Sequence, residues 1–324
     1  MKKVFSFFLI LSFLFKSSLL LQVQYTNPVI KIDAPDPTVI KDGDYYYLYS
    51  TAEKIFKSKD LVNWIFVRNV FDGKKRPTFV DVKFYWAPCI TKQDNLYILY
   101  FALAQWGKGE TGAIGVATSK SPEGPFDLVG DGKLFTSKEI GVINSIDPFY
   151  IEEDGKKYLI WGSFHGIYGV ELTKEGTKVK NMNNKFQIAG SKFEGSYIYK
   201  RNDYYYLFVS IGSCCDGDNS TYQAVVGRSK NLKGPYLSQK GESMLDNKYT
   251  VILSGNQKFV GPGHDSRIVL DKNGKTWMLY HAYLRGNSKI GRVVCLDEVK
   301  WTNDNWPYFE GSSPSITQKE GPSL

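Results

Sequence analysis

The sequence predicts an all-β chain, and specifically a five-bladed β-propeller. Aromatic side chains make up 15% of the 324 residues, which favours strands over helices. A short motif of an aromatic, any residue, an aliphatic and a second aromatic recurs five times, and every copy follows a tight-turn signal. Three or four short strands per repeat with no helical pattern fit radial blades better than two packed sheets, which are the alternative.

Residues 1–24 are predicted to be a secretory signal peptide. Lys2 and Lys3 precede an apolar run over residues 4–15, which ends at Lys16. This run is shorter than the roughly 20 residues that a membrane-spanning helix needs, and a basic start before a short apolar run is typical of an export signal. We therefore expect a secreted, periplasmic or extracellular protein whose mature domain, residues 25–324, has no membrane span. An uncleaved N-terminal anchor is the alternative.

The mature domain contains the five repeats. The two aromatic residues of the motif are Tyr46/Tyr49, Tyr97/Tyr100, Tyr158/Trp161, Tyr205/Phe208 and Trp277/Tyr280. The turn signals before them are Asp42-Gly43, Asp94-Asn95, Asp154-Gly155, Asn202-Asp203 and Asn273-Gly274. First strands are expected before these turns, at 38–40, 88–90, 149–151, 197–199 and 268–270. Third strands are expected at 55–59, 115–120, 168–174, 224–230 and 292–296.

Charge and motif content exclude several classes of partner and reaction. The formal net charge of +8 falls to +5 once the three lysines of residues 1–24 are removed. The remaining basic residues form no clustered stripe, so no nucleic-acid partner is expected. The sequence also lacks a serine-nucleophile elbow, a P-loop, a GxGxxG turn after a strand and an HExxH motif. We expect a monomer.

Four cysteines are too few for a disulfide framework. The adjacent pair Cys214 and Cys215 has neither zinc-ribbon spacing nor a CxxC pattern. We expect buried thiols at these two positions, with a disulfide between the neighbours as the alternative.

Counting back ten or eleven residues from each repeat aromatic locates the leading end of each first strand. The residues found there are Asp36, Trp86, Asp147, Glu194 and Ser266, the last directly after His264 and Asp265. First strands surround the axis of a propeller, so these side chains are expected to meet in one axial depression. A turn or a capped strand end explains each acid taken singly. It explains less well why three acids lie at the same distance before the aromatic residues of their repeats.

Three carboxylates beside a tryptophan suggest the hydrolysis of a sugar acetal. One group must protonate the leaving oxygen, and another must deprotonate water or attack the sugar carbon. Glu194 has aromatic neighbours that should raise its pKa, which suits a general acid. Asp36 would be the ionised base, and Asp147 a third charge that keeps Glu194 protonated. Trp86 would stack on the sugar, although core packing also explains it.

His264 is a candidate metal contact. It lies in a Gly-Pro-Gly-His stretch at the axial end of the fifth repeat, where the backbone comes close to the axis. A single histidine is not a metal site by itself, and a hydrogen-bonded histidine without a metal is the alternative.

At this point the residues match a known family. The matching stretches are DAPDP (33–37), WAP (86–88), SIDP (145–148), YLIWGSF (158–164), residues 194–210, CC with STY (214–215 and 220–222), VGRS (226–229), GPY (234–236), GPGH (261–264) and YHAY (280–283). On these stretches the chain resembles glycoside hydrolase family 43, and within it the endo-α-1,5-L-arabinanases. They cover nearly the whole mature chain.

The resemblance implies an inverting mechanism on a five-bladed propeller, acting on arabinan, a side chain of pectin. It implies a base at Asp36, a general acid at Glu194 and, at Asp147, an acid that modulates the pKa of the general acid. It also implies an axial calcium ion approached by His264. The substrate contacts that it implies are Trp86, Asn144, Ser163 and Phe164. The chain departs from some relatives at Gly195-Ser196, where they have Ala-Pro after the acid.

Four other functions remain open. An exo-acting arabinanase, an α-L-arabinofuranosidase or a β-xylosidase of the same family would close one end of the groove with a loop, and the insertion at 240–261 is a candidate for that loop. From another class, the propeller would be a non-catalytic carbohydrate-binding module, which the presence of all three acids disfavours.

Overall fold

The computed structural model describes residues 22–324 except 72, 74, 75 and 83. The signal peptide predicted for residues 1–24 therefore falls almost entirely outside the described residues. No helix in the described part of the chain combines the length and the apolar character needed to cross a membrane.

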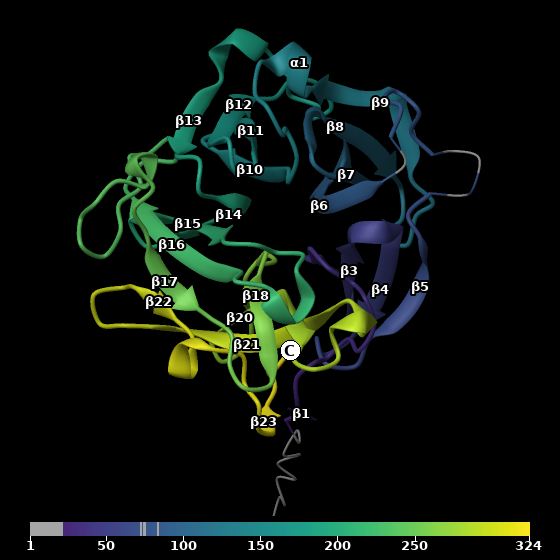
Figure 1. The fold of residues 1–324 in the computed structure, drawn as a ribbon. Helices are drawn as coiled ribbons and strands as arrows, with labels where there is room; N and C mark the ends of the chain where they lie inside the picture. Colours follow the sequence, from purple (N-terminus) through teal and green to yellow (C-terminus); the bar gives the residue numbers. More distant parts are fainter. Residues whose placement is uncertain (1–21, 72, 74–75, 83) are drawn as a thin grey trace, which may run out of the picture.

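The described residues form five antiparallel sheets arranged in a ring, which confirms the predicted five-bladed propeller (Figure 1). Blade one contains β2 (Thr38–Asp42), β3 (Tyr45–Ser50), β4 (Lys54–Ser58) and β5 (Ile65–Asn69). Blade two contains β6 (Tyr85–Gln93), β7 (Leu96–Gln105), β8 (Lys108–Ser119) and β9 (Asp127–Thr136). Blade three contains β10 (Phe149–Glu153), β11 (Lys156–Trp161), β12 (Ile167–Glu171) and β13 (Phe186–Ala189).

Blades four and five complete the ring. Blade four contains β14 (Glu194–Arg201), β15 (Tyr204–Ile211), β16 (Gln223–Ser229) and β17 (Thr250–Leu253). Blade five contains β18 (Phe259–Gly263), β19 (Val269–Leu270), β20 (Thr276–Leu284), β21 (Arg292–Trp301) and β22 (Pro307–Tyr308). The short helical segments are α1 (Ser137–Ile140), η1 (Thr51–Glu53), η3 (Met182–Asn184), η4 (Gly217–Asn219), η5 (Met244–Asp246), η6 (Ser288–Ile290) and η7 (Glu310–Ser312).

The repeated motif forms the second strand of every blade. The final aromatic of each copy is completely buried, at Tyr49, Tyr100, Trp161, Phe208 and Tyr280. These strands pack against neighbouring blades on both faces, so they read as nearly continuous apolar runs rather than alternating ones. The recurrence of the motif therefore follows from the recurrence of one packing environment.

The first strand of blade five is split, which corrects the prediction for 268–270. The strands β18 and β19 both pair with β20, through Val260↔Tyr283 and Val269↔Trp277. The predicted strand is only the second of these two pieces. His264 and Asp265 lie in the break between them, where the backbone is free of the ladder.

The two ends of the described chain meet at blade five. Strands β1 (Gln24–Tyr25) and β23 (Lys319–Glu320) pair antiparallel (Figure 1). Buried Asp297 accepts hydrogen bonds from Asn27 Nδ2 at 2.9 Å and from the backbone N–H of Ser315 at 3.1 Å. The first and last segments of the described chain are thus tied to the same blade.

The insertion at 240–261 is not a loop over one face. Its middle forms β17, which is the outer strand of blade four and pairs with β16. Met244 is completely buried, and Ile252 nearly so. Residues 250–253 of this segment therefore complete blade four.

Candidate active site

The leading ends of the five innermost strands share one backbone feature. Each contributes one residue with positive φ: Asp36 (55°), Ala87 (40°), Asp147 (59°), Gly195 (60°) and His264 (50°). Such values are uncommon for residues other than glycine. In blades two and four, this residue lies one position after the residue that our count gave, because the strand register shifts within β6 and β14. In blade five it is two residues earlier, because the first strand is split.

The predicted residues nevertheless come together around the axis, except Ser266, which does not line the pocket there. One pocket is lined by Asp36, Trp86, Trp106, Ile146, Asp147, Glu194, Cys214, Cys215, His264 and Arg292. These residues come from all five blades, and the three carboxylates are each less than 8% exposed. Of the predicted substrate contacts, Trp86 lines this pocket, while Asn144, Ser163 and Phe164 do not.

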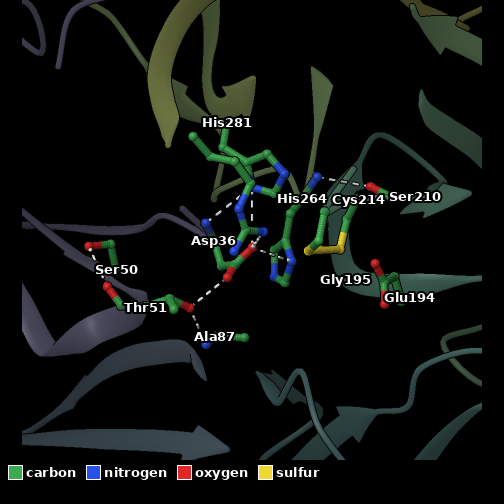
Figure 2. Close-up of polar contacts among 12 residues, drawn as sticks. Asp36, Ser50, Thr51, Ala87, Glu194, Gly195, Ser210, Cys214, His264 and His281 are labelled. Atoms are coloured by element: carbon green, nitrogen blue, oxygen red, sulfur yellow. Dashed lines mark hydrogen bonds and ion pairs between the residues drawn. A yellow bond between two sulfur atoms is a disulfide. The ribbon is translucent and has the colours of Figure 1, made fainter. Parts of the chain in front are cut away.

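Asp36 is surrounded by cationic and polar donors (Figure 2). Its Oδ1 accepts a hydrogen bond from the Arg292 guanidinium at 3.0 Å and lies 3.2 Å from His264 Nδ1. Its Oδ2 accepts from the Thr51 hydroxyl at 2.5 Å. Burial by itself raises the pKa of Asp36, but the charges of Arg292 and His264 and these hydrogen bonds outweigh it and hold the pKa well below its usual range. Asp36 is therefore ionised.

Asp147 and Glu194 have fewer partners. Glu194 Oε2 accepts a hydrogen bond from the Ser163 hydroxyl at 2.7 Å, and Asp147 Oδ2 accepts from the Gly195 N–H at 3.0 Å. Burial raises the pKa of both carboxyls, that of Asp147 to about 7, with the negative charges of its neighbours adding to the effect. Because the two acids interact, their protons belong to the pair rather than to either residue.

Two histidines flank Asp36 and differ in charge. Burial lowers the pKa of His264, but the negative charges of Asp36 and the other two carboxyls outweigh burial and raise it to about 9. His281 is completely buried, and burial together with the nearby Arg292 charge lowers its pKa to about 4. Neutral His281 accepts the backbone N–H of Asp36 at Nδ1, at 3.2 Å. The same nitrogen also lies 3.2 Å from Asp36 Oδ1, but the two groups do not form an ion pair because His281 is neutral.

The His264 ring explains the residue that follows Glu194. A Cβ atom at Gly195 would lie 3.1 Å from the ring of His264, and the φ of +60° also favours glycine. The departure from Ala-Pro at 195–196 thus accompanies close packing of the histidine against the backbone.

Aromatic side chains form the apolar side of the pocket. The rings of Trp86 and Trp106 meet edge to face at 6.1 Å, and Trp106 is 68% exposed. Phe164, which follows β11 in blade three, is 37% exposed. Asn144 Nδ2 donates to the Ser163 carbonyl at 3.1 Å, so Asn144 supports the residue that contacts Glu194.

The cysteine prediction was wrong in both respects. Cys214 and Cys215 are joined by a disulfide rather than present as thiols, and both are half-buried at the pocket rather than fully buried. The loop between β15 and β16 carries them to this face of blade four. Cys89 and Cys295 are free and buried, as expected for structural thiols.

A family model decides the relationship of the chain to known proteins. The model for glycosyl hydrolases family 43 matches residues 25–307. The chain belongs to family 43. It is 32% identical over 311 residues to an extracellular exo-α-(1→5)-L-arabinofuranosidase of Cellvibrio japonicus, which covers 86% of this chain and 87% of that protein. It is 33% identical over 295 residues to extracellular endo-α-(1→5)-L-arabinanase 1 of Bacillus subtilis, with coverages of 85% and 87%.

Solved structures agree with this family 43 assignment. The structure of Cellvibrio cellulosa α-L-arabinanase complexed with arabinohexaose has a TM-score of 0.79 and 30% identity, and covers 87% of this chain and 96% of that one. A family 43 endo-arabinanase from Bacillus licheniformis has a TM-score of 0.74 and 30% identity, with coverages of 86% and 97%.

Sequence reasoning missed three residues of this family 43 pocket: Thr51, Trp106 and Arg292. A usable signal existed for all three. Thr51 and Trp106 directly follow second strands, and Arg292 opens a third strand, so all three belong to the face where the first strands begin.

Proposed function

We propose that the protein is an exported arabinanase that hydrolyses internal α-1,5-L-arabinofuranosidic bonds of arabinan with inversion. The observation that carries the proposal is the pairing, in one axial pocket, of an ionised Asp36 with a Glu194 whose pKa is raised. Hydrolysis of an acetal requires a base and an acid in these two states. The names of the relatives from Bacillus subtilis and Cellvibrio japonicus support the substrate class and export.

Asp36 is the general base. Its carboxylate takes a proton from a water molecule while the water oxygen attacks the anomeric carbon. Glu194 is the general acid and donates its proton to the glycosidic oxygen as the bond from that oxygen to the anomeric carbon breaks. The new bond forms on the face opposite the departing sugar, so the configuration inverts.

Asp147 is a positioning residue. It accepts the N–H of Gly195, directly after Glu194, and its charge opposes ionisation of Glu194. Because the Asp147 pKa of about 7 belongs to a shared titration with Glu194, one proton stays in this pair near neutral pH. That proton is the one delivered to the leaving group.

The sugar-binding surface extends from the pocket over blades two and three. Trp86 and Trp106 offer faces to the C–H surfaces of the arabinose units, and exposed Phe164 extends the apolar surface. Ser163 orients Glu194, and Asn144 holds Ser163. An extended aromatic surface suits a polymer that continues beyond the cleaved bond.

We also propose an axial calcium ion near His264, and the chemistry of the buried residues fits it. Both carboxylate oxygens of Asp265 are buried without a hydrogen-bond partner, and calcium prefers oxygen ligands. Among the described residues, no group of three His, Cys, Asp or Glu side chains could hold a metal ion, so water would supply most of the ligands beside Asp265 and His264, and His264 would have to lose its proton to bind the ion. When bound, the ion supplies positive charge that offsets the buried carboxylates.

An exo-acting enzyme is the second candidate, because the relative from Cellvibrio japonicus is named as one. Such an enzyme needs one end of its groove to be blocked. In the segment at 240–261, which we considered for that role, residues 250–253 form the outer strand of blade four. None of the described residues that line the pocket of the three carboxylates belongs to this segment, and this favours endo action.

The test is to incubate the protein, which we expect to be monomeric, with linear arabinan and follow product sizes. Early oligosaccharides of mixed length support endo action, and arabinose alone supports the exo candidate. Binding without cleavage would contradict the proposed activity and indicate a carbohydrate-binding module. Cleavage of xylo-oligosaccharides in preference to arabinan would indicate a β-xylosidase. The first anomer released, observed by NMR, tests inversion.

A further inference from the structure

We propose that the Cys214–Cys215 disulfide is a substrate-contacting element that packs a rigid apolar surface against a sugar unit bound beside the three carboxylates. The proposal rests on the proposed arabinanase function and adds a specificity-determining contact to the same pocket. Three observations carry it: where the disulfide lies, how its loop is held, and what a bond between neighbouring residues can contribute.

The disulfide lies in the pocket rather than in the core. Both cysteines are half-buried and line the same pocket as Asp36, Glu194 and Trp86. Figure 2 draws the disulfide in one view with His264 and Glu194. The Trp86 wall comes from blade two and the disulfide from blade four, which are not adjacent in the ring (Figure 1). Apolar surfaces therefore approach the bound sugar from two separate blades.

The loop that carries the disulfide is held by other contacts. The N–H of Ser213 donates to Thr221 Oγ1 at 3.0 Å, and the Ser220 hydroxyl donates to the Ser213 carbonyl at 2.6 Å. Asp218 accepts the N–H of Gly286 at 2.7 Å, which ties the loop to blade five. These bonds do not involve the cysteines, so the loop does not need the disulfide to stay on the rim of the pocket.

A disulfide between adjacent residues has little chain to constrain. The stabilisation expected from a cross-link grows with the number of residues in the closed loop, and this loop contains only the two cysteines. What the bond changes is the local surface. Two mobile thiols become one fixed ring with two polarisable sulfur atoms, a suitable surface for sugar C–H groups. A fixed surface also avoids the entropy cost of ordering side chains when the sugar binds.

The chemistry of the chain allows the disulfide to be removed selectively. The chain has four cysteines, and Cys89 and Cys295 are free and buried. A water-soluble phosphine therefore has one disulfide to reduce. Reduction places two electrons and two protons on the sulfur atoms to give two thiols, while the phosphine takes the oxygen of one water molecule and becomes the phosphine oxide.

The experiment measures arabinohexaose affinity by calorimetry in a Glu194→Gln background, which slows turnover. Affinity is compared between the oxidised protein, the phosphine-reduced protein and the variant in which Cys214→Ser and Cys215→Ser are combined. We expect the Kd to rise about tenfold in both altered forms, which corresponds to about 1.4 kcal/mol. We expect the Tm to be nearly unchanged and the affinity to return on reoxidation. As a control, the phosphine should have no effect on the double serine variant.

Each outcome has a separate meaning. Equal affinity of the oxidised, reduced and serine forms would overturn the contact role. Loss of affinity together with a large fall in Tm would also overturn it, because the disulfide would then be structural. If the oxidised protein itself does not bind arabinohexaose, the proposed substrate is wrong, and that failure is visible without comparing redox states.

Discussion

At the blade-one side of the pocket, Asp36 is contacted by Arg292 and Thr51, whereas at the blade-four side Glu194 receives one hydrogen bond from Ser163. The first carboxyl has its pKa held well below the usual range, and the second has its pKa raised. Both acids are buried to a similar extent. Burial therefore does not assign the two roles, and the presence or absence of a cationic partner does.

The largest expected effect follows from removing either group. Asp36→Asn and Glu194→Gln each lose a proton-transfer residue, and each should lower kcat on arabinan by about 10² to 10⁴. The Kd for arabinohexaose should change little. Steady-state kinetics with linear arabinan checks both variants.

A matched control is Glu152→Gln, which changes an exposed acid on β10 outside the pocket and should retain the parent activity. Near-normal activity of Asp36→Asn or Glu194→Gln would refute the assigned roles.

Removing the Arg292 guanidinium should make the surroundings of Asp36 resemble those of Glu194, which has no cationic partner in hydrogen-bond contact among the described residues. Without the Arg292 charge, the pKa of Asp36 rises, and because catalysis needs Asp36 ionised, the loss of activity at low pH should begin at a higher pH. The shift in Arg292→Met should be about one pH unit or more. The pH profile of kcat/KM measures it, with Arg292→Lys as the charge-retaining control. An unchanged acid limb in Arg292→Met would contradict the comparison.

Asp265 extends the comparison to an acid with no hydrogen-bond partner. Burial raises the pKa of Asp265 to about 7, above its value in the unfolded chain. The folded protein therefore binds this proton more tightly than the unfolded chain does. The resulting stabilisation of the fold is fully present below about pH 4 and is lost as the pH rises through about 7. At pH 8 without calcium, Asp265→Asn should therefore raise the Tm. Calcium should stabilise the parent protein and have less effect on the variant. Thermal unfolding with EDTA and with calcium tests both points, and identical responses of the two proteins would contradict the proposed ion.

The smallest effect concerns Ser163, whose hydroxyl donates a hydrogen bond to Glu194. The Ser163 hydrogen bond lowers the pKa of Glu194, so Ser163→Ala should raise it. Because Glu194 acts when protonated, the loss of activity at high pH should move upward by less than about one pH unit, the usual scale for one neutral hydrogen bond. The basic limb of the kcat/KM profile checks this, and a downward shift would contradict the role of Ser163.

Much of the fold was predictable from sequence because one packing environment recurs. Buried second strands such as β7 and β15 repeat the same aromatic motif, and the turns before them carry residues that accept positive φ. The break between β18 and β19 was not predictable, since a split strand leaves the aromatic spacing of β20 unchanged. The same limit explains why our count was wrong by one residue in β6 and β14. A register shift in each of these strands adds one residue before the motif and leaves the motif itself unchanged.

The meeting of the three carboxyls was predictable in outline, but their environment was not. The repeat places Asp36 and Asp147 at the same position of their blades, and Glu194 lies one residue before that position, next to Gly195. Arg292 contacts Asp36 although 256 positions separate them, and nothing local to either residue indicates the pair. The sequence left the Cys214–Cys215 bond as the alternative to two thiols, because which of the two forms depends on the conformation of one loop.

The central claim, that Glu194 supplies a proton and Asp36 removes one, is tested most directly by changing the leaving group. Arabinan is compared with an arabino-oligosaccharide whose leaving group is 4-nitrophenol, which departs without protonation. Glu194→Gln should lose far less activity on the aryl substrate than on arabinan, whereas Asp36→Asn should lose about equally on both. The same loss on both substrates in Glu194→Gln would contradict the account.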